Sequence, residues 1–440
     1  MSSPEATANA INGNVMKQVA LSTRFSGAAN DHSLRTPDIP EFLAARVARY
    51  YRERKHQSWG GRHILHGRTP GPDALPLSSN DYLSIARHPR ILEAMTSSLA
   101  NEGNSTLMSG IFLHGESPQL DFENNLAHFM KAEAGVLCQS GYAANVGLIQ
   151  SIAGDQVPVY VDMLAHMSLW EGIRSARAQS IAFYHNQPEH LERQILRNGP
   201  GVILIDTVYS TNGSLCPLRD IAEIAGRHDC ILVADESHSL GTHGPNGEGL
   251  VVELGLEDQV HFRTASLAKA FAARAGFITC SSSFSEYFKF ESLPAIFSST
   301  LLPHEVAGLA ATLEVIESEG WRRDSLRANS DYLRAGLDKL GYNLNGSRSQ
   351  IVSLESGTES QTIVLRDALE ERGIFGSVFC APATPKNRAM VRLSLHTNLD
   401  KHDLDRILVA CDEARAVTGF EQWPSTRRRR GAVRETVAEA

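Results

Sequence analysis

Short apolar runs alternate with helical patterns through the middle of the chain. Five of these runs are candidates for buried strands: Gly135–Cys138, Val157–Val161, Gly201–Ile205, Cys230–Ala234 and Gly276–Thr279. Helical patterns such as Leu218–His228 lie between them. Continuous apolar runs are typical of parallel strands buried on both faces, and alternation with helices places helices on both sides of the sheet. The sequence therefore predicts an α/β fold with a mostly parallel sheet.

The regions on either side of this pattern differ from it in composition. Residues 1–36 are small and polar and are expected to form a flexible arm, followed by a helix and linker over 37–85. The large domain is expected to span 86–302. After it, a long helical region and short strands predict a smaller α+β domain over 303–418, and a flexible basic tail is expected over 419–440.

Two helices are predicted outside the alternating region. Apolar residues recur at helical spacing between Pro37 and about Gln57. Ser117 and Pro118 supply the N-cap and first-turn proline of the second helix.

Composition is that of a globular protein without a nucleic-acid or membrane partner. The chain has 440 residues, 42% hydrophobic and 21% charged, and its net charge of −8 does not favour an anionic partner. No apolar run reaches the roughly 18–20 residues of a transmembrane helix. The first residues lack the charged-then-apolar order of a signal peptide. We therefore expect a cytoplasmic protein.

Cysteines and arginines add two minor expectations. The six cysteines are scattered and form no C-x-x-C pair, which argues against a disulfide framework or a structural zinc site: Cys138, Cys216, Cys230, Cys280, Cys380 and Cys411. Arg427–Arg430 form a basic run near the end of the chain. Such runs are usually solvated tails rather than binding patches, and we interpret this one so.

An aspartate and a lysine indicate the class of chemistry. Asp235 ends the Cys230–Ala234 strand, and Lys269 follows the next apolar segment. In open α/β sheets, ligands bind outside the carboxyl ends of the strands. A lysine there can form the Schiff base of pyridoxal phosphate (PLP), and the acid can hold the pyridine nitrogen protonated. The pair predicts PLP as the cofactor.

Two further features are ambiguous on their own. Ser140–Asn145 lies between a strand and a helix, where backbone N–H groups could hold a phosphate. A simple helix start explains it equally well. His166 could stack on a pyridine ring, although most single histidines are merely packed.

Two other kinds of site are disfavoured. Ser266–Lys269 matches the S-x-x-K of serine acyl-enzymes, but the chain has Ser79–Asp81 in the wrong order for S-D-N, and no K-T-G. Four neighbouring side chains are of metal-ligand types: Asp235, Glu236, His238 and His243. No complementary cluster lies nearby in sequence, so no metal is expected.

Together these segments resemble the α-oxoamine synthase family of PLP-dependent enzymes, from about Pro37 to Ala414. Four motifs occur in the family's order: Ser79–Leu83, Ser140–Asn145, Asp235–His238 and Phe297–Thr300. The resemblance implies an aminotransferase-like (fold type I) large domain with a smaller C-terminal domain. Longer runs resemble the branch that makes α-aminoketone precursors of α-hydroxyketone quorum-sensing signals: Ala165–Gly172, Asp235–Gly247, Thr264–Lys269, Pro294–Pro303 and Phe375–Cys380.

The resemblance assigns catalytic roles to matching positions. Lys269 is implied to be the Schiff-base lysine, and Asp235 to pair with the pyridinium nitrogen. His166 is implied to stack on the ring. His238 and Ser210 are implied to lie near the phenolic oxygen of the cofactor.

The resemblance also implies how phosphate and substrate are held. Three residues would hold the phosphate: Gly141, Tyr142 and Ser266. Thr300 would reach the phosphate from a second subunit, which implies a homodimer with shared active sites. Arg392 would clamp the amino-acid carboxylate, and Asn80 would line the substrate site.

Two departures agree with the signal-producing branch: Ala268 and Ala270 flank the lysine, and Ser237 replaces the usual Ala of D-E-A-H. That branch implies an acyltransferase that joins an acyl-CoA, medium-chain, to an S-adenosylmethionine or 2-aminobutyrate donor with loss of carbon dioxide. The alternatives are a primary-metabolic member, such as 8-amino-7-oxononanoate synthase or glycine C-acetyltransferase, and a catalytically silent PLP-fold binding or regulatory protein.

Overall fold

The computed structural model describes residues 37–105 and 107–429, which fall into two compact units divided between Gln57 and Ser58. The first unit is helical, as predicted. It contains α2 (Glu41–Arg49) and most of the π-helical segment η2 (Tyr50–Ser58). The whole predicted arm, 1–36, and the last part of the predicted tail, 430–440, lie outside the described residues.

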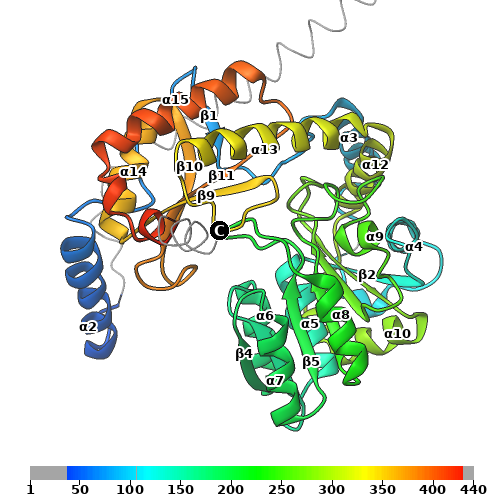
Figure 1. Cartoon of the computed structure of the whole chain (residues 1–440). Helices are drawn as coiled ribbons and strands as arrows, with labels where there is room; N and C mark the ends of the chain where they lie inside the picture. The colour runs from blue at the N-terminus through cyan, green and yellow to red at the C-terminus, as the bar shows by residue number, and fades with distance from the viewer. Residues whose placement is uncertain (1–36, 106, 430–440) are drawn as a thin grey trace, which may run out of the picture. The chain divides into compact units, whose positions relative to one another are not determined.

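The second unit contains a seven-stranded sheet that is mostly parallel, as predicted (Figure 1). Its strands, in spatial order, are β2 (Ala134–Cys138), β8 (Gly276–Cys280), β7 (Phe262–Ser266), β6 (Ile231–Asp235), β5 (Val202–Asp206), β3 (Pro158–Asp162) and β4 (Gln179–Phe183). Only β8 runs antiparallel to its neighbours. The five predicted strands are confirmed, whereas β4 and β7 were not predicted.

Helices cover both faces of this sheet, because alternate side chains of each strand pack into different cores. On β5, Ile203 and Ile205 join one apolar cluster, while Val202 and Leu204 join another. The helices that connect the strands are α5 (Gly141–Ile152), α6 (Met167–Ser175), α7 (Pro188–Asn198), α8 (Leu218–Arg227) and α9 (Leu250–Leu254). Two more helices, α10 (Ser282–Glu291) and α11 (Leu293–Ile296), follow β8.

A second, four-stranded sheet lies in the same unit. Its order is β1 (Leu75–Leu77), β10 (Ile374–Phe379), β11 (Ala389–Ser394) and β9 (Ile351–Gly357). β1 comes from before the large sheet and pairs in parallel with β10. The helices around it are α13 (Trp321–Lys339), α14 (Glu359–Glu371) and α15 (Lys401–Val417) (Figure 1). Helix α12 (Pro303–Ser318) comes before them in the chain.

Three short elements and two longer helices complete the described chain. Helix α3 (Pro89–Glu102) packs against α12. Helix α4 (Pro118–Phe129) begins as predicted, because the Ser117 side chain accepts a hydrogen bond from the Leu120 amide. The short elements are β1, already described, and the 3-10 turns η3 (Gly110–Phe112) and η4 (Phe420–Gln422). None of the helices in the described ranges combines the length and apolarity needed to cross a membrane.

Residues 419–429 differ from the flexible tail expected there. The Trp423 side chain is buried, and its indole N–H donates to the Thr418 carbonyl at 3.0 Å. Ser425 and Thr426 are also buried. The basic run that follows is therefore anchored by an aromatic side chain, which composition alone did not indicate.

Candidate active site

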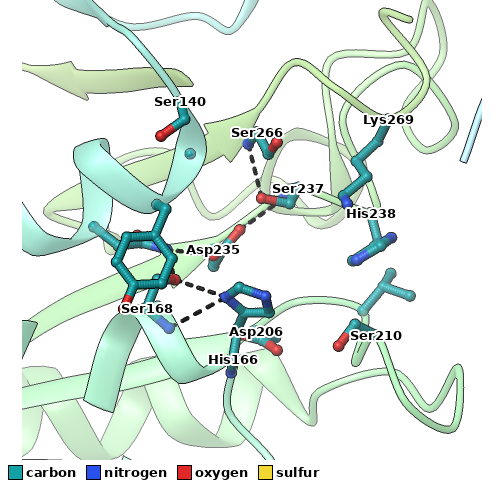
Figure 2. A pocket seen from close by; sticks show the side chains of 14 residues that line it. Ser140, His166, Ser168, Asp206, Ser210, Asp235, Ser237, His238, Ser266 and Lys269 are labelled. Atoms are coloured by element: carbon teal, nitrogen blue, oxygen red, sulfur yellow. Dashed lines mark hydrogen bonds between the residues drawn. The ribbon is translucent and has the colours of Figure 1, made fainter. Parts of the chain in front are cut away.

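A pocket of about 180 Å³ lies at the carboxyl ends of the parallel strands. β5, β6 and β7 end there in Asp206, Asp235 and Ser266. Figure 2 shows the fourteen residues that line it: Ser140, Gly141, Tyr142, Asn145, His166, Ser168, Asp206, Val208, Ser210, Asp235, Ser237, His238, Ser266 and Lys269. Eight of the eleven predicted site residues are among them.

The Asp235 carboxylate is buried and held by two donors. Its Oδ2 accepts from Asn145 Nδ2 at 2.7 Å, and its Oδ1 accepts from the Ser237 amide at 2.9 Å. Hydrogen bonds from N–H groups stabilise the charged form of a carboxylate. The pocket therefore contains a fixed negative charge at one end.

The same asparagine connects Asp235 to His166. Asn145 Nδ2 also donates to Ser168 Oγ at 2.9 Å, and Ser168 Oγ lies 2.7 Å from His166 Nδ1. Thr264 Oγ1 donates to Asn145 Oδ1 at 2.6 Å, which fixes the orientation of the amide. Burial lowers the pKa of His166, against the opposing charge of Asp235, so the imidazole stays neutral.

Lys269 lies in the loop after β7, and its side chain is directed toward His238 (Figure 2). Burial is the main cause that lowers its pKa, and the charge of Arg392 adds to it, while Asp235 opposes both. A lowered pKa leaves more of the amine neutral and nucleophilic. The amine is therefore suited to covalent chemistry and proton transfer.

His238 is buried against a tyrosine that was not assigned a role from the sequence. Its Nδ1 lies 2.7 Å from Tyr82 Oη. Burial, with the charges of Lys269 and Arg392, lowers the pKa of His238 well below its usual range. Burial raises the pKa of Tyr82 to about 12. Both groups are thus neutral, and one hydrogen bond is shared between them.

The amino end of α5 approaches the end of β7 closely. A Cβ at Gly141 would lie 2.5 Å from the Ser266 Cβ, so only glycine fits there. The Ser140 side chain caps the helix by accepting from the Ala143 amide at 3.1 Å. Free N–H groups and the helix dipole make such an end a binding site for a phosphate.

Asn80, Ser210 and Arg392 are brought together beside the pocket. The buried guanidinium of Arg392, on β11, donates to Asn80 Oδ1 at 2.9 Å and to the Ser210 carbonyl at 2.8 Å. It also lies over the Phe379 ring, 4.6 Å from its centroid. Its Nε has no partner within the described chain.

Thr300 is the predicted site residue that the structure places apart. It lines a separate, smaller cavity with Gly110 and Gln139, and its amide donates to the Met108 carbonyl at 2.8 Å. It does not cap the next helix, because Leu302 is the N-cap of α12. Within its own chain, Thr300 therefore does not line the pocket of Lys269.

Comparisons with known proteins agree with this geometry. Residues 72–410 match the family model of aminotransferase class I and II. The chain is 47% identical over 380 residues to the CAI-1 autoinducer synthase of Vibrio campbellii, covering 86% of this chain and 96% of the relative. The chain belongs to the α-oxoamine synthase family. It is a PLP-dependent acyltransferase.

One further relative and one solved structure match at lower sequence identity. The chain is 31% identical over 343 residues to 8-amino-7-oxononanoate synthase 1 of Bacillus subtilis, covering 76% of this chain and 86% of the relative. The solved structure of Sphingomonas wittichii serine palmitoyltransferase superimposes with a TM-score of 0.79 at 24% identity, over 87% of this chain and 100% of that one. This likeness confirms the predicted fold.

The pocket of this α-oxoamine synthase fits PLP. Asp235 would pair with the protonated ring nitrogen of PLP, and the amino end of α5 would hold its phosphate. Lys269 would supply the amine that reacts with its aldehyde. Asp206 Oδ2 is buried without a partner in the described chain, and burial together with the charge of Asp235 raises the pKa of Asp206 well above its usual range. A protonated Asp206 adds a donor, not a second negative charge.

The side chains considered as metal ligands do not converge. Glu236 turns away from the pocket and accepts from the Val251 amide at 3.0 Å, and no group of three ligand-type side chains forms a metal site in the described ranges. Sequence reasoning missed Tyr82, Asn145 and Ser168. The signal for Asn145 was a single amide side chain within the apolar run Ala143–Ile149 of α5.

Proposed function

We propose that this enzyme joins an acyl-CoA, of medium chain length, to S-adenosylmethionine or 2-aminobutyrate. Coenzyme A and carbon dioxide leave, and the product is an α-aminoketone, the precursor of an α-hydroxyketone quorum-sensing signal. The observation that carries the reaction type is the convergence of Lys269, Asp235 and the α5 end in one pocket. The match to the Vibrio campbellii autoinducer synthase, 47% identical across 96% of its length, supports the substrate class.

The roles of the side chains follow from their charges. When bound, PLP supplies an aldehyde that takes up amines and a ring that accepts electrons from the α-carbon. Asp235, held by Asn145 and Ser237, favours a proton on the ring nitrogen. Lys269, with its lowered pKa, takes the proton from the α-carbon and later returns it.

His166 and His238 complete the environment without adding charge. Both imidazoles are neutral, so they do not offset the negative charge of Asp235 at the other end of the site. We infer that the His166 ring faces the cofactor ring, and that His238 holds its phenolic oxygen with Ser210.

Arg392 is proposed to bind the amino-acid carboxylate. Two of its nitrogens already donate to Asn80 and to the Ser210 carbonyl, and its Nε has no partner in the described chain. A substrate carboxylate can therefore accept from Nε and take the place of Asn80 on the guanidinium. The Asn80 side chain, released from Arg392, would then hydrogen-bond to the substrate. Arginine is suited to this because its planar donors match a carboxylate.

We also propose that the enzyme is a homodimer in which Thr300 serves the partner's cofactor phosphate. Thr300 does not line the Lys269 pocket of its own chain. Phe297, three residues earlier, is 81% exposed, and Phe290 in α10 is 67% exposed. Large aromatic side chains that are exposed in the single chain are typical of an interface.

The substrates are tested by offering the enzyme a mixed pool of acyl-CoA chain lengths with several amino donors and identifying products by mass spectrometry. We expect medium-chain α-aminoketones from S-adenosylmethionine or 2-aminobutyrate. Preferential use of alanine with a carboxylated acyl-CoA, or of glycine with acetyl-CoA, would instead assign a primary-metabolic reaction.

A further inference from the structure

Six arginines gather where α13 passes the loop before β9 and the segment after η4. We call this surface the arginine groove: Arg323, Arg327, Arg334, Arg348, Arg428 and Arg429. It consists of an open cavity of about 960 Å³ and a smaller one of about 60 Å³. Arg334 and Arg348 line both cavities, so the two are adjacent.

Positive charge in the groove exceeds the negative charge that lines it. The carboxylates in its described lining are Asp331 and Asp338. Asp331 forms an ion pair with Arg334, and Asp338 forms one with Arg429 at 2.8 Å. Arg327 and Arg348 are exposed; both line the smaller cavity, and Arg348 also lines the open one.

Arg327 and Arg348 have no neutralising partner among the residues that the structure describes. Neither guanidinium has a hydrogen bond or ion pair with any residue in the ranges that the structure describes. Arg348 lies close enough to Arg334 to act on its pKa, which burial lowers against the opposing charge and hydrogen bond of Asp331, and the charge of Arg348 lowers it further. Two like charges held side by side favour a bound anion.

The two ends of the groove are also incompletely neutralised. Arg428 pairs with Glu355 at 2.5 Å, but this buried carboxylate is shared with Arg388 at 2.8 Å. Arg323 donates to the carbonyls of Ile316 and Pro245, and its side chain forms no ion pair within the described chain. Burial lowers the pKa of Arg323, and the acids that oppose this are Glu248 and Asp324.

His243 forms part of the smaller cavity. Its Nδ1 lies 3.1 Å from Thr242 Oγ1. Burial lowers its pKa, as do the charges of Arg327 and Arg334, while Glu253 opposes them. A neutral imidazole there can donate a hydrogen bond to a bound anion. A carboxylate in the same place would repel that anion.

We propose that the arginine groove binds a small anion that carries two or more phosphate groups. Guanidinium groups match phosphate oxygens in pairs, and the open cavity has the size of a small-ligand pocket. Arg327 and Arg348 would hold one phosphate, and Arg428 and Arg429 a second. The site differs from the cofactor cradle, which is built from the amino end of α5.

The groove and the active site share a wall. The His238 carbonyl accepts from Thr242 Oγ1 at 3.1 Å and from Gln350 Nε2 at 2.9 Å. Thr242 and Gln350 line the smaller cavity, while His238 lines the catalytic pocket. An anion in the groove therefore contacts the segment that positions His238.

The test is calorimetric titration of the PLP-loaded enzyme, whose cofactor phosphate site is already filled. Pyrophosphate should bind once per chain, more weakly at higher salt. Arg327→Gln/Arg348→Gln should weaken binding at least about tenfold, because it removes the two unpaired charges. The matched control is Arg193→Gln/Arg197→Gln, which removes two exposed arginines from α7 and should bind like the parent.

Further arms identify the source of the phosphates. Tighter binding of adenosine 3′,5′-bisphosphate than of pyrophosphate would assign a nucleotide, and the reverse order an inorganic polyphosphate; single phosphate should bind more weakly than either. Absence of pyrophosphate binding at millimolar concentration, or equal binding by the two double variants, would overturn the proposal. Neither result bears on the proposed reaction, which is measured separately by product analysis.

Discussion

At the scale of single residues, the chemistry depends on an amine whose charge is weakened by its surroundings. Burial and the charge of Arg392 lower the pKa of Lys269. We expect Lys269→Ala to reduce turnover by more than about 1,000-fold, because it removes both the nucleophile and the proton-transfer group. Product formation and the circular dichroism spectrum are the measurements. A well-folded variant with parental activity would refute the assignment.

A second residue-scale prediction concerns Asp235. Asp235→Asn keeps the shape but removes the charge that favours a protonated ring nitrogen, so α-proton exchange should slow by roughly 100-fold or more. The measurement is exchange in deuterium oxide with the amino acid alone, at saturating cofactor. A rate equal to that of the parent enzyme contradicts the role. Saturation separates this effect from weaker cofactor binding.

Most of the residues that line the pocket could be predicted because they belong to short sequence motifs. The side chains that hydrogen-bond to those of Asp235 and His238 could not be predicted, since those hydrogen bonds join residues far apart in the chain. Asn145 bonds Asp235 across 90 positions, and Tyr82 reaches His238 across 156. A single sequence does not indicate which of two such distant residues will pair, and the catalytic roles themselves stay predictions.

At the scale of elements, apolar patterning predicted the strands that are buried by hydrophobic side chains. It missed β7, where Arg263 and Thr264 are buried polar residues, and β4, which is partly exposed. It also missed β1, a three-residue strand whose pairing with β10 depends on distant residues. Trp423 shows the same limit, because it is buried by contacts that include the rings of Tyr342 and Phe420.

Strand β9 carries a charge that links stability to pH. Burial acts to raise the pKa of Glu355, but hydrogen bonds from Arg388 and Arg428 lower it overall. A carboxylate with a lowered folded-state pKa stabilises the fold above its unfolded pKa of about 4.3, and this contribution is lost as the pH falls through the folded value. Glu355→Gln should therefore cost about 1–3 kcal/mol at neutral pH.

The measurement is the free energy of unfolding in urea from pH 7 to pH 3. The difference between the parent and Glu355→Gln should be full at pH 7 and should shrink below about pH 4.3. The exposed Glu116, changed to Gln, is the control and should have little effect. A difference independent of pH would mean that packing, not charge, holds this strand.

At the scale of the whole molecule, the proposed sharing of sites predicts complementation. In a mixed dimer of a Lys269→Ala chain and a Thr300→Glu chain, both defects should fall in the same site. The other site stays intact, and about half of the parental activity per dimer returns. The measurement is the activity of heterodimers purified with two different affinity tags.

The opposite arrangement gives a different result. If Thr300 serves its own chain, each site of the heterodimer carries one defect and no activity returns. The two parental mutant homodimers, mixed after purification without exchange of chains, are the control. A fully active monomer at assay concentration would also exclude shared sites.

Arg392 has a consequence for the entropy of substrate binding. Its guanidinium is fixed by Asn80, the Ser210 carbonyl and the Phe379 ring before any substrate arrives. An arginine that is free in solution must give up rotamer freedom when it captures a carboxylate, at a cost of about 0.5–1.5 kcal/mol. Here folding has already ordered the side chain, so the receptor is preorganised and recognition requires only an exchange of acceptors.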